Sequence, residues 1–203
     1  MIVADPRLEA ELIAERRANG LDRHDEVWEG TYVVMPLPNN EHQILAALLT
    51  ALLVELVFKQ GRGIVTGPTN LTDRESDWTE NFRAPDLAVF LTDGSAENRD
   101  THWLGGPDLV IEIVSPGDRS EQKLDFYASV GTREVLLVER DPWRLRLFRV
   151  SDGAMLAAGE ASVDGADAVQ TETVPIAWTL EAATEGERPK LVLTDTDGTR
   201  QEI

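Results

Sequence analysis

The chain has 203 residues, of which 42% are hydrophobic and 28% charged, a composition typical of a globular protein. Its 37 acidic residues against 19 lysines and arginines give a formal net charge of -18, which argues against an extended basic surface for nucleic acid. It contains no cysteine, so disulfides, thiolate metal sites and a cysteine nucleophile are excluded.

The amino-terminal stretch, residues 1–17, is acidic and amphipathic and lacks the basic and apolar blocks of a signal peptide. The longest apolar-rich run, residues 44–58, is interrupted by Thr50 and Glu55 and is not expected to span a membrane. We therefore expect a cytoplasmic protein with no membrane partner. No repeat or clear linker divides the chain, so residues 1–203 are expected to form a single domain.

The first part of the chain predicts two helices separated by strands. A surface helix begins near Pro6 and ends at Gly20, and an apolar-rich run around Gly30 indicates a strand pair or a bulged strand. Asn39 or Asn40 then caps the strongest helix, whose apolar residues recur at helical spacing and place it in the core. These apolar residues are Ile44, Leu45, Leu48, Leu49, Leu52, Leu53, Leu56 and Val57.

Two predicted strands carry acids in unusual positions. Residues 84–90 form a strand with Asp86 near its start, where the acid is either a metal ligand or fixes a turn or pairs with Arg83. Residues 108–114 are nearly continuously apolar, as in a strand covered on both faces, so an unpaired charge on Glu112 would be costly. Glu112 is therefore either part of a site or neutralised by a structural lysine or arginine.

A helix with a cap at Asp118 and an end at Gly131 follows, and it carries Lys123 and Tyr127 on one face. Residues 134–150 then predict a β-hairpin at the edge of the sheet. Its arginines either contact phosphate or mark a solvated strand face. These arginines are Arg140, Arg144, Arg146 and Arg149.

The chemistry available to this chain rests on carboxylates and a lysine, because phosphate-binding glycine loops, GxSxG and HExxH motifs are missing. Asp108 and Glu112 lie on one strand about 13 Å apart, too far to share a metal. Asp86, from a neighbouring strand, is the better partner for Glu112, and two such acids would suit Mg²⁺ or Mn²⁺. Lys123 is the candidate for the group that stabilises charge on a phosphate. His42, in the first turn of the core helix, is either functional or locally bonded.

These motifs together resemble the bacterial putative restriction endonuclease family of the PD-(D/E)XK nuclease superfamily. The resemblance covers about residues 25–150 and rests on several ordered segments rather than on any one of them. The segments are Gly30, Pro36 to Pro38, Glu41-His42, Ala84-Pro-Asp86, the stretch from Gly106 through Glu112 to Pro116, Lys123 with Tyr127 and Gly131, and residues 134–138.

The resemblance implies a mixed α/β (α+β) fold, in which a restriction-endonuclease-like mixed β-sheet is flanked by helices. Residues 151–203 would add a β-rich carboxy-terminal extension. It further implies that Asp86, Glu112 and the backbone carbonyl of Ile113 hold Mg²⁺ or Mn²⁺, with no organic cofactor. In this superfamily the lysine follows the glutamate by two residues, but that position here is Val114, so Lys123 is expected to take the role.

Two functions follow from the resemblance. The first is hydrolysis of DNA phosphodiester bonds by a divalent-metal-dependent endonuclease, with Asp86, Glu112 and Lys123 as the catalytic residues. The second is a catalytically inactive nuclease-like fold that acts as a binding or regulatory module. A homodimer fits either function, because hairpin edges and apolar strands favour two-fold pairing. The accessory candidates are Glu41, His42, Ser115 and Tyr127.

Overall fold

A computed structural model describes residues 6–115, 119–165, 167–184 and 187–203. Its centre is a mixed six-stranded sheet in the order β12-β11-β10-β9-β6-β3, in which β9 and β10 are parallel and the other neighbours are antiparallel. The strands are β3 (Gly63–Thr66), β6 (Leu87–Leu91), β9 (Leu109–Val114), β10 (Glu134–Arg140), β11 (Trp143–Ser151) and β12 (Ala154–Ser162).

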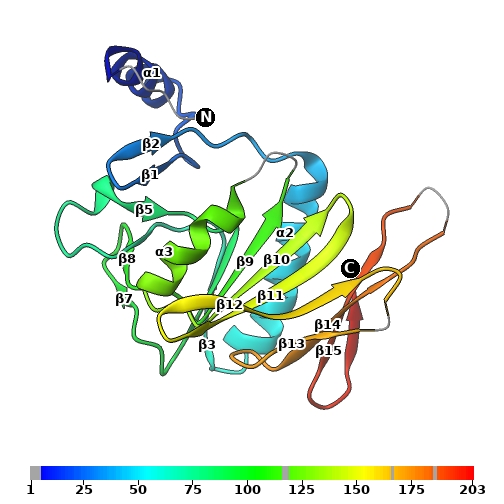
Figure 1. The fold of residues 1–203 in the computed structure, drawn as a ribbon. Helices are drawn as coiled ribbons and strands as arrows, with labels where there is room; N and C mark the ends of the chain where they lie inside the picture. Colours follow the sequence, from blue (N-terminus) through cyan, green and yellow to red (C-terminus); the bar gives the residue numbers. More distant parts are fainter. Residues whose placement is uncertain (1–5, 116–118, 166, 185–186) are drawn as a thin grey trace.

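Helices lie on both faces of this sheet, as Figure 1 shows, with α2 on one face and α3 on the other. Helix α2 (Asn40–Leu53) continues as the π-helical turn η1 (Val54–Phe58), whereas the 3₁₀ turn η3 (Ser120–Lys123) leads into α3 (Leu124–Ser129). The Asn39 side chain accepts the His42 N–H at 2.9 Å and so caps α2. The predicted mixed fold with flanking helices is therefore confirmed.

The buried side of α2 packs against the central sheet at helical spacing. Leu45, Leu49, Leu53 and Val57 are fully buried in one apolar cluster with sheet residues such as Ile111. Leu52 and Leu56 are partly buried against the same cluster, whereas Ile44 is 54% exposed and Leu48 is 38% exposed. The helix thus belongs to the core along one face, and its opposite face carries apolar side chains that reach the surface.

A second sheet, in the order β2-β1-β5-β4-β8-β7, borders the central one. It contains the strand pair expected around Gly30, and helix α1 (Pro6–Ala18) precedes it. The strands are β1 (Glu26–Trp28), β2 (Thr31–Val33), β4 (Leu71–Thr72), β5 (Phe82–Arg83), β7 (Glu97–Asn98) and β8 (Trp103–Leu104), and a 3₁₀ turn η2 (Trp78–Glu80) precedes β5. This sheet places β1 beside the start of β6, which matters for the site.

The carboxy-terminal part forms a third, antiparallel sheet, as expected for a β-rich extension. Its strands are β13 (Val169–Thr171), β14 (Ile176–Glu181), β15 (Lys190–Asp195) and β16 (Arg200–Glu202). Its apolar residues join the cluster that also contains the buried face of α2.

The interpretation of residues 134–150 as an edge hairpin was wrong, because β12 pairs with β11 and β10 lies inside the central sheet. The alanine-rich sequence of β12 has little strand propensity and hid this outer strand.

The segment Asn40–Phe58 has a mean hydropathy of 1.6 and, by length and composition alone, is long enough to cross a membrane. The packing of its buried face against the central sheet is that of a core helix in a globular fold. The predicted cap at Asp118 lies outside the residues that the structure describes.

Candidate active site

The pairing of β6 with β9 brings Asp86 and Glu112 to neighbouring positions. Leu87 is the partner of Ile111 in this antiparallel pair, so continuing the register by one residue sets Asp86 opposite Glu112. Directly opposite residues project their side chains from the same face of a sheet. Oδ2 of Asp86 also accepts the backbone N–H of Ile113 at 2.7 Å, which fixes this carboxylate at the end of β9.

Lys123 reaches these acids from the turn η3 on the same side of the sheet. Its Nζ lies 3.0 Å from Oε1 of Glu112 and 2.9 Å from Oε1 of Glu26. The side chain of Lys123 is 2% exposed, so both ion pairs are shielded from water. The lysine that was expected on the helix therefore lies in direct contact with Glu112.

Glu26 is the residue of this site that the sequence did not reveal. It is fully buried on β1, and besides Lys123 it accepts the Ala84 N–H at 2.9 Å and the Trp28 Nε1–H at 2.6 Å. The contacts with Ala84 and Lys123 come from segments far from Glu26 in the chain. The residues that flank Glu26 in the sequence are a short mixture of polar and apolar side chains that matches no functional motif. Only its place next to an apolar strand run hinted at burial.

Two of the accessory candidates contact the acids directly. His42 Nε2 lies 2.9 Å from Oδ1 of Asp86, and the hydroxyl of Tyr127 donates a hydrogen bond to Oε1 of Glu112. Both side chains are buried. Asp86 is thus held by a histidine and a backbone amide, while Glu112 is held by a lysine and a tyrosine.

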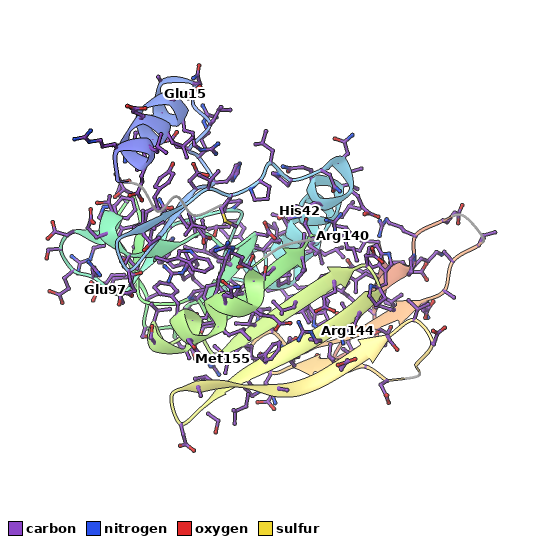
Figure 2. All side chains as sticks on the ribbon, turned by 45° about the horizontal axis from the view of Figure 1, so that its top comes forward. Glu15, His42, Glu97, Arg140, Arg144 and Met155 are labelled. Carbon is purple, nitrogen blue, oxygen red and sulfur yellow. The ribbon has the colours of Figure 1, made fainter. Side chains whose placement is uncertain are left out.

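The other two accessory candidates contact Arg140 instead. Its guanidinium donates to Glu41 Oε2 at 2.9 Å and to Ser115 Oγ at 2.7 Å, and it also binds the capping residue Asn39 at 3.0 Å. Figure 2 shows Arg140 close to the end of α2 that carries His42. Arg140 therefore ties the start of α2 to the end of β9, and Glu41 and Ser115 contribute to that structural link.

Asp86 has no ion pair with Arg83 within the described residues. Arg83 instead donates to Val27 O at 2.9 Å and lies over the rings of Trp28 and Phe126. Asp108, at the other end of β9, accepts the Leu91 N–H and pairs with Arg133, away from the site.

A cavity of about 390 Å³ connects the site to the surface. Asp86, Glu112 and Lys123 all line it, as do His42 and Ser115. Volumes of this order are typical of small-molecule sites. The side chain of Asp86 is 22% exposed and that of Glu112 only 3%, so the acids form the floor of the cavity and Asp86 is the more accessible.

The electrostatics of the site are dominated by an excess of buried carboxylates. Burial raises the pKa of Glu112 to about 8, the charges on Asp86 and Glu26 act in the same direction, and Lys123 opposes them. Burial lowers the pKa of Lys123, but Glu112 and Glu26 outweigh it and raise that pKa, so the lysine stays protonated. Burial, with the charge on Glu112, raises the pKa of Tyr127 well above its ordinary value, so the tyrosine is a neutral donor.

The donor set suits a hard divalent cation in its chemistry. Three carboxylates face one lysine, so a cation would neutralise the surplus negative charge, and carboxylate oxygens are the ligands that Mg²⁺ and Mn²⁺ prefer. Among the described residues, the hydrogen bonds to Glu112 both go to Oε1, which leaves Oε2 available. The described residues contain no cluster of three His, Cys, Asp or Glu side chains arranged around a metal position. A cation here would therefore need a backbone carbonyl and water as further ligands.

Three comparisons with known proteins bear on this site. The model of the family Uma2, described as "Putative restriction endonuclease", matches residues 11–183. A solved structure, described as a putative nuclease belonging to DUF820 from Anabaena variabilis ATCC 29413, is 18% identical and has a TM-score of 0.59. The match covers 74% of this chain and 83% of that chain. No match was found among curated proteins.

Proposed function

The chain belongs to the Uma2 family of putative restriction endonucleases, and on this premise we propose that it is a divalent-metal-dependent nuclease that hydrolyses DNA phosphodiester bonds. The observation that carries the proposal is the convergence of Asp86, Glu112 and Lys123 on one cavity, with the Lys123 amine 3.0 Å from Glu112. Carboxylates from adjacent strands and a protonated lysine are the groups that metal-assisted phosphoryl transfer requires.

In this proposal Asp86, Glu112 and the carbonyl of Ile113 hold Mg²⁺ or Mn²⁺. The Ile113 N–H points to Asp86, and in a strand the N–H and C=O of one residue face the same neighbour, which supports the choice of that carbonyl. A bound divalent cation polarises a phosphate oxygen and lowers the pKa of water.

The protein groups around the acids have separate tasks. Lys123 is fixed between Glu112 and Glu26 and presents a permanent positive charge at the cavity wall, where it stabilises charge that develops on a phosphate. Tyr127 and Lys123 occupy one oxygen of Glu112 and orient the other. His42 positions Asp86 through its Nε2.

One observation favours the alternative, a nuclease-like fold that serves as a binding or regulatory module. Both oxygens of Asp86 and one oxygen of Glu112 are already engaged by protein groups, and the described residues contain no ready three-ligand cluster. In that alternative the contacts from Lys123 and His42 hold the acids in place without a metal. For either function we propose a cytoplasmic location, because the chain has no cysteine and thus no disulfide to form in an oxidising compartment.

The test is a cleavage assay on linear and supercoiled DNA with Mn²⁺ or Mg²⁺, comparing the wild type with Glu112→Gln. The substitution replaces a carboxylate oxygen that could bind the cation by an amide of nearly the same shape, so circular dichroism should show an unchanged fold while cleavage is lost. Glu160→Gln, an exposed matched control, should cut at the wild-type rate. Absence of cleavage by the wild type, or equal cleavage by wild type and Glu112→Gln, would contradict the proposal.

A further inference from the structure

One wall of the active-site cavity is apolar. It is built by residues 35–38, the sequence Met-Pro-Leu-Pro between β2 and α2, whose side chains carry no N–H or O–H group. Figure 1 shows this segment crossing from β2 to α2 at the end of the central sheet. Asp86, Glu112 and Lys123 line the same cavity. A ligand that reaches the acids therefore meets charged groups at the floor and an apolar surface at the side.

These two surfaces match the two parts of a nucleotide. A phosphate suits the floor, where Lys123 and the proposed divalent cation meet its charge. A base has apolar faces that pack on apolar side chains and polar edges that form hydrogen bonds. Leu37 is 73% exposed and offers its surface to such a face, and the exposed amide of Gln43 lines the cavity and can bind an edge. The chemistry of the cavity thus fits one nucleotide.

The dimensions of the cavity separate an unpaired nucleotide from a paired one. The side chains of Asp86, Glu112 and Lys123 are only 22%, 3% and 2% exposed, so a phosphate contacts them from inside the cavity. Its volume of about 390 Å³ is near the lower end of the range of ~300–1,000 Å³ for small-molecule sites. A double helix is stiff and its bases are stacked, so it must unstack a nucleotide before that nucleotide can enter such a space. An unpaired nucleotide enters without this cost.

Two cations next to the cavity are already paired, which also argues against a duplex ligand. Lys123 is bound by two buried carboxylates, and Arg140, which contacts the lining residue Ser115, pairs with Glu41 at 2.9 Å. Proteins that hold duplex DNA neutralise phosphates with lysines and arginines that are free to do so. A single strand carries half the charge per length of a duplex, so a chain with a net charge of -18 repels it less.

We propose that the substrate of this site is unpaired DNA, from which one nucleotide enters the cavity with its phosphate at Asp86 and Glu112 and its base against Leu37. The inference rests on the proposed nuclease function and narrows its substrate class. Single strands and mismatched segments are cut, whereas fully paired DNA is cut only where it opens. Supercoiled DNA, in which torsion favours unpairing, is therefore cut in preference to linear duplex.

Binding measured without cleavage tests the inference. We expect fluorescence anisotropy in Ca²⁺, which also takes carboxylate ligands, to show a labelled single strand bound at least about tenfold more tightly than the same strand annealed to its complement. Leu37→Ser should weaken single-strand binding about fivefold, because the base loses its apolar contact. Leu156→Ser, an equally accessible matched control on β12 that is 55% exposed and lies outside the cavity lining, should bind as the wild type does. Equal or absent binding of the two DNA forms, or an unchanged affinity in Leu37→Ser, would overturn the inference.

Cleavage with Mn²⁺ separates the inference from the function on which it rests. A duplex with a central run of mismatches should be cut within that run, and the fully paired duplex should be cut at least about tenfold more slowly. Cleavage of both duplexes at the same rate would overturn the inference but support the nuclease function. Absence of cleavage of every DNA form would contradict the nuclease function, and the anisotropy measurement would still decide whether the cavity takes unpaired DNA.

Discussion

Nζ of Lys123 lies 3.0 Å from Oε1 of Glu112, although the lysine is on the turn η3 and the glutamate is in the middle of a buried strand. The same amine lies 2.9 Å from Oε1 of Glu26, so one lysine bridges two buried carboxylates. Because an unpaired charge in the interior is costly, this lysine must support the fold as well as the proposed chemistry.

Replacement of Lys123 by methionine keeps the length of the side chain but leaves Glu26 and Glu112 without their cation. Removal of one partner from a buried ion pair costs about 3–5 kcal/mol, so we expect a loss of that size in the free energy of unfolding. Urea denaturation measures it. The control Lys59→Met breaks only the exposed pair with Glu55 and should change stability by less than about 0.5 kcal/mol. If both variants lost equally little free energy of unfolding, the buried ion pairs of Lys123 would contribute little to stability.

Glu134 should anchor the carboxy-terminal sheet to the central one. Its buried carboxylate binds Arg149 at 2.9 Å and accepts the backbone N–H groups of Glu172 and Thr173, just before β14. Glu134→Gln removes the charge that strengthens these bonds, so we expect a loss of about 3 kcal/mol and faster proteolysis within residues 151–203. Denaturation and limited trypsin digestion check this, with Glu160→Gln as the exposed control. Unchanged trypsin digestion of Glu134→Gln would contradict the expectation that Glu134 holds the carboxy-terminal sheet to the central one.

The two tyrosines of the chain should resist ionisation in the native state. Burial, with the hydrogen bond to Asp25, raises the pKa of Tyr32 to about 12, and burial raises that of Tyr127 well above its ordinary value. Because each folded pKa exceeds the unfolded value of about 10, the contribution of the neutral, buried hydroxyls to the free energy of unfolding is full below pH 10. That contribution is lost as the pH rises through the folded pKa.

Ultraviolet titration tests this directly. At about pH 11, where a free tyrosine is mostly ionised, native protein should show little tyrosinate absorbance and urea-unfolded protein should show both groups ionised. Titration of either native tyrosine near pH 10 would contradict the buried positions of the two hydroxyls.

The salt dependence of DNA cleavage should be shallow. The arginines of the β10–β11 hairpin, for which the sequence allowed either phosphate contact or a solvated strand face, are paired with acids. The pairs are Arg140 with Glu41, Arg144 with Glu139 and Glu160, Arg146 with Glu121 and Glu139, and Arg149 with Glu134 and Glu172. Few are therefore free to displace counterions from DNA. At fixed Mn²⁺, we expect log(kcat/KM) to fall with log[KCl] at a slope of about -2 or shallower. A slope steeper than about -5 would indicate a phosphate-binding surface that these ion pairs do not predict.

The sequence predicted those parts of the fold that depend on local pattern. The apolar period of α2 and the continuous apolar run of β9 appear in the structure as expected. Of the two asparagines that the sequence offered as the cap of α2, Asn39 takes that position. The exposure of Ile44 could not be predicted, because periodicity identifies an apolar residue but not whether a neighbour covers it.

The residues of the candidate site also fall into those that the sequence indicated and those that it did not. Asp86 and Glu112 stood out because acids are rare at the start and in the middle of apolar strands, and Lys123 was found by seeking a cation on the next helix. Glu26 was not predicted, because its ion-pair partner Lys123 is far away in the sequence and the residues next to Glu26 carry no pattern that indicates the pair. The position of β12 as the outer strand of the central sheet was also not predicted, because strand order is set by tertiary packing rather than by local sequence.

We propose that Asp86 and Glu112 together hold a divalent cation, and titration calorimetry with Mn²⁺ measures this binding without relying on cleavage. We predict one binding site per chain in the wild type and in the exposed control Asp164→Asn, and loss of that site in Asp86→Asn with the fold intact by circular dichroism. Absence of Mn²⁺ binding by the wild type, or unchanged binding by Asp86→Asn, would contradict the claim.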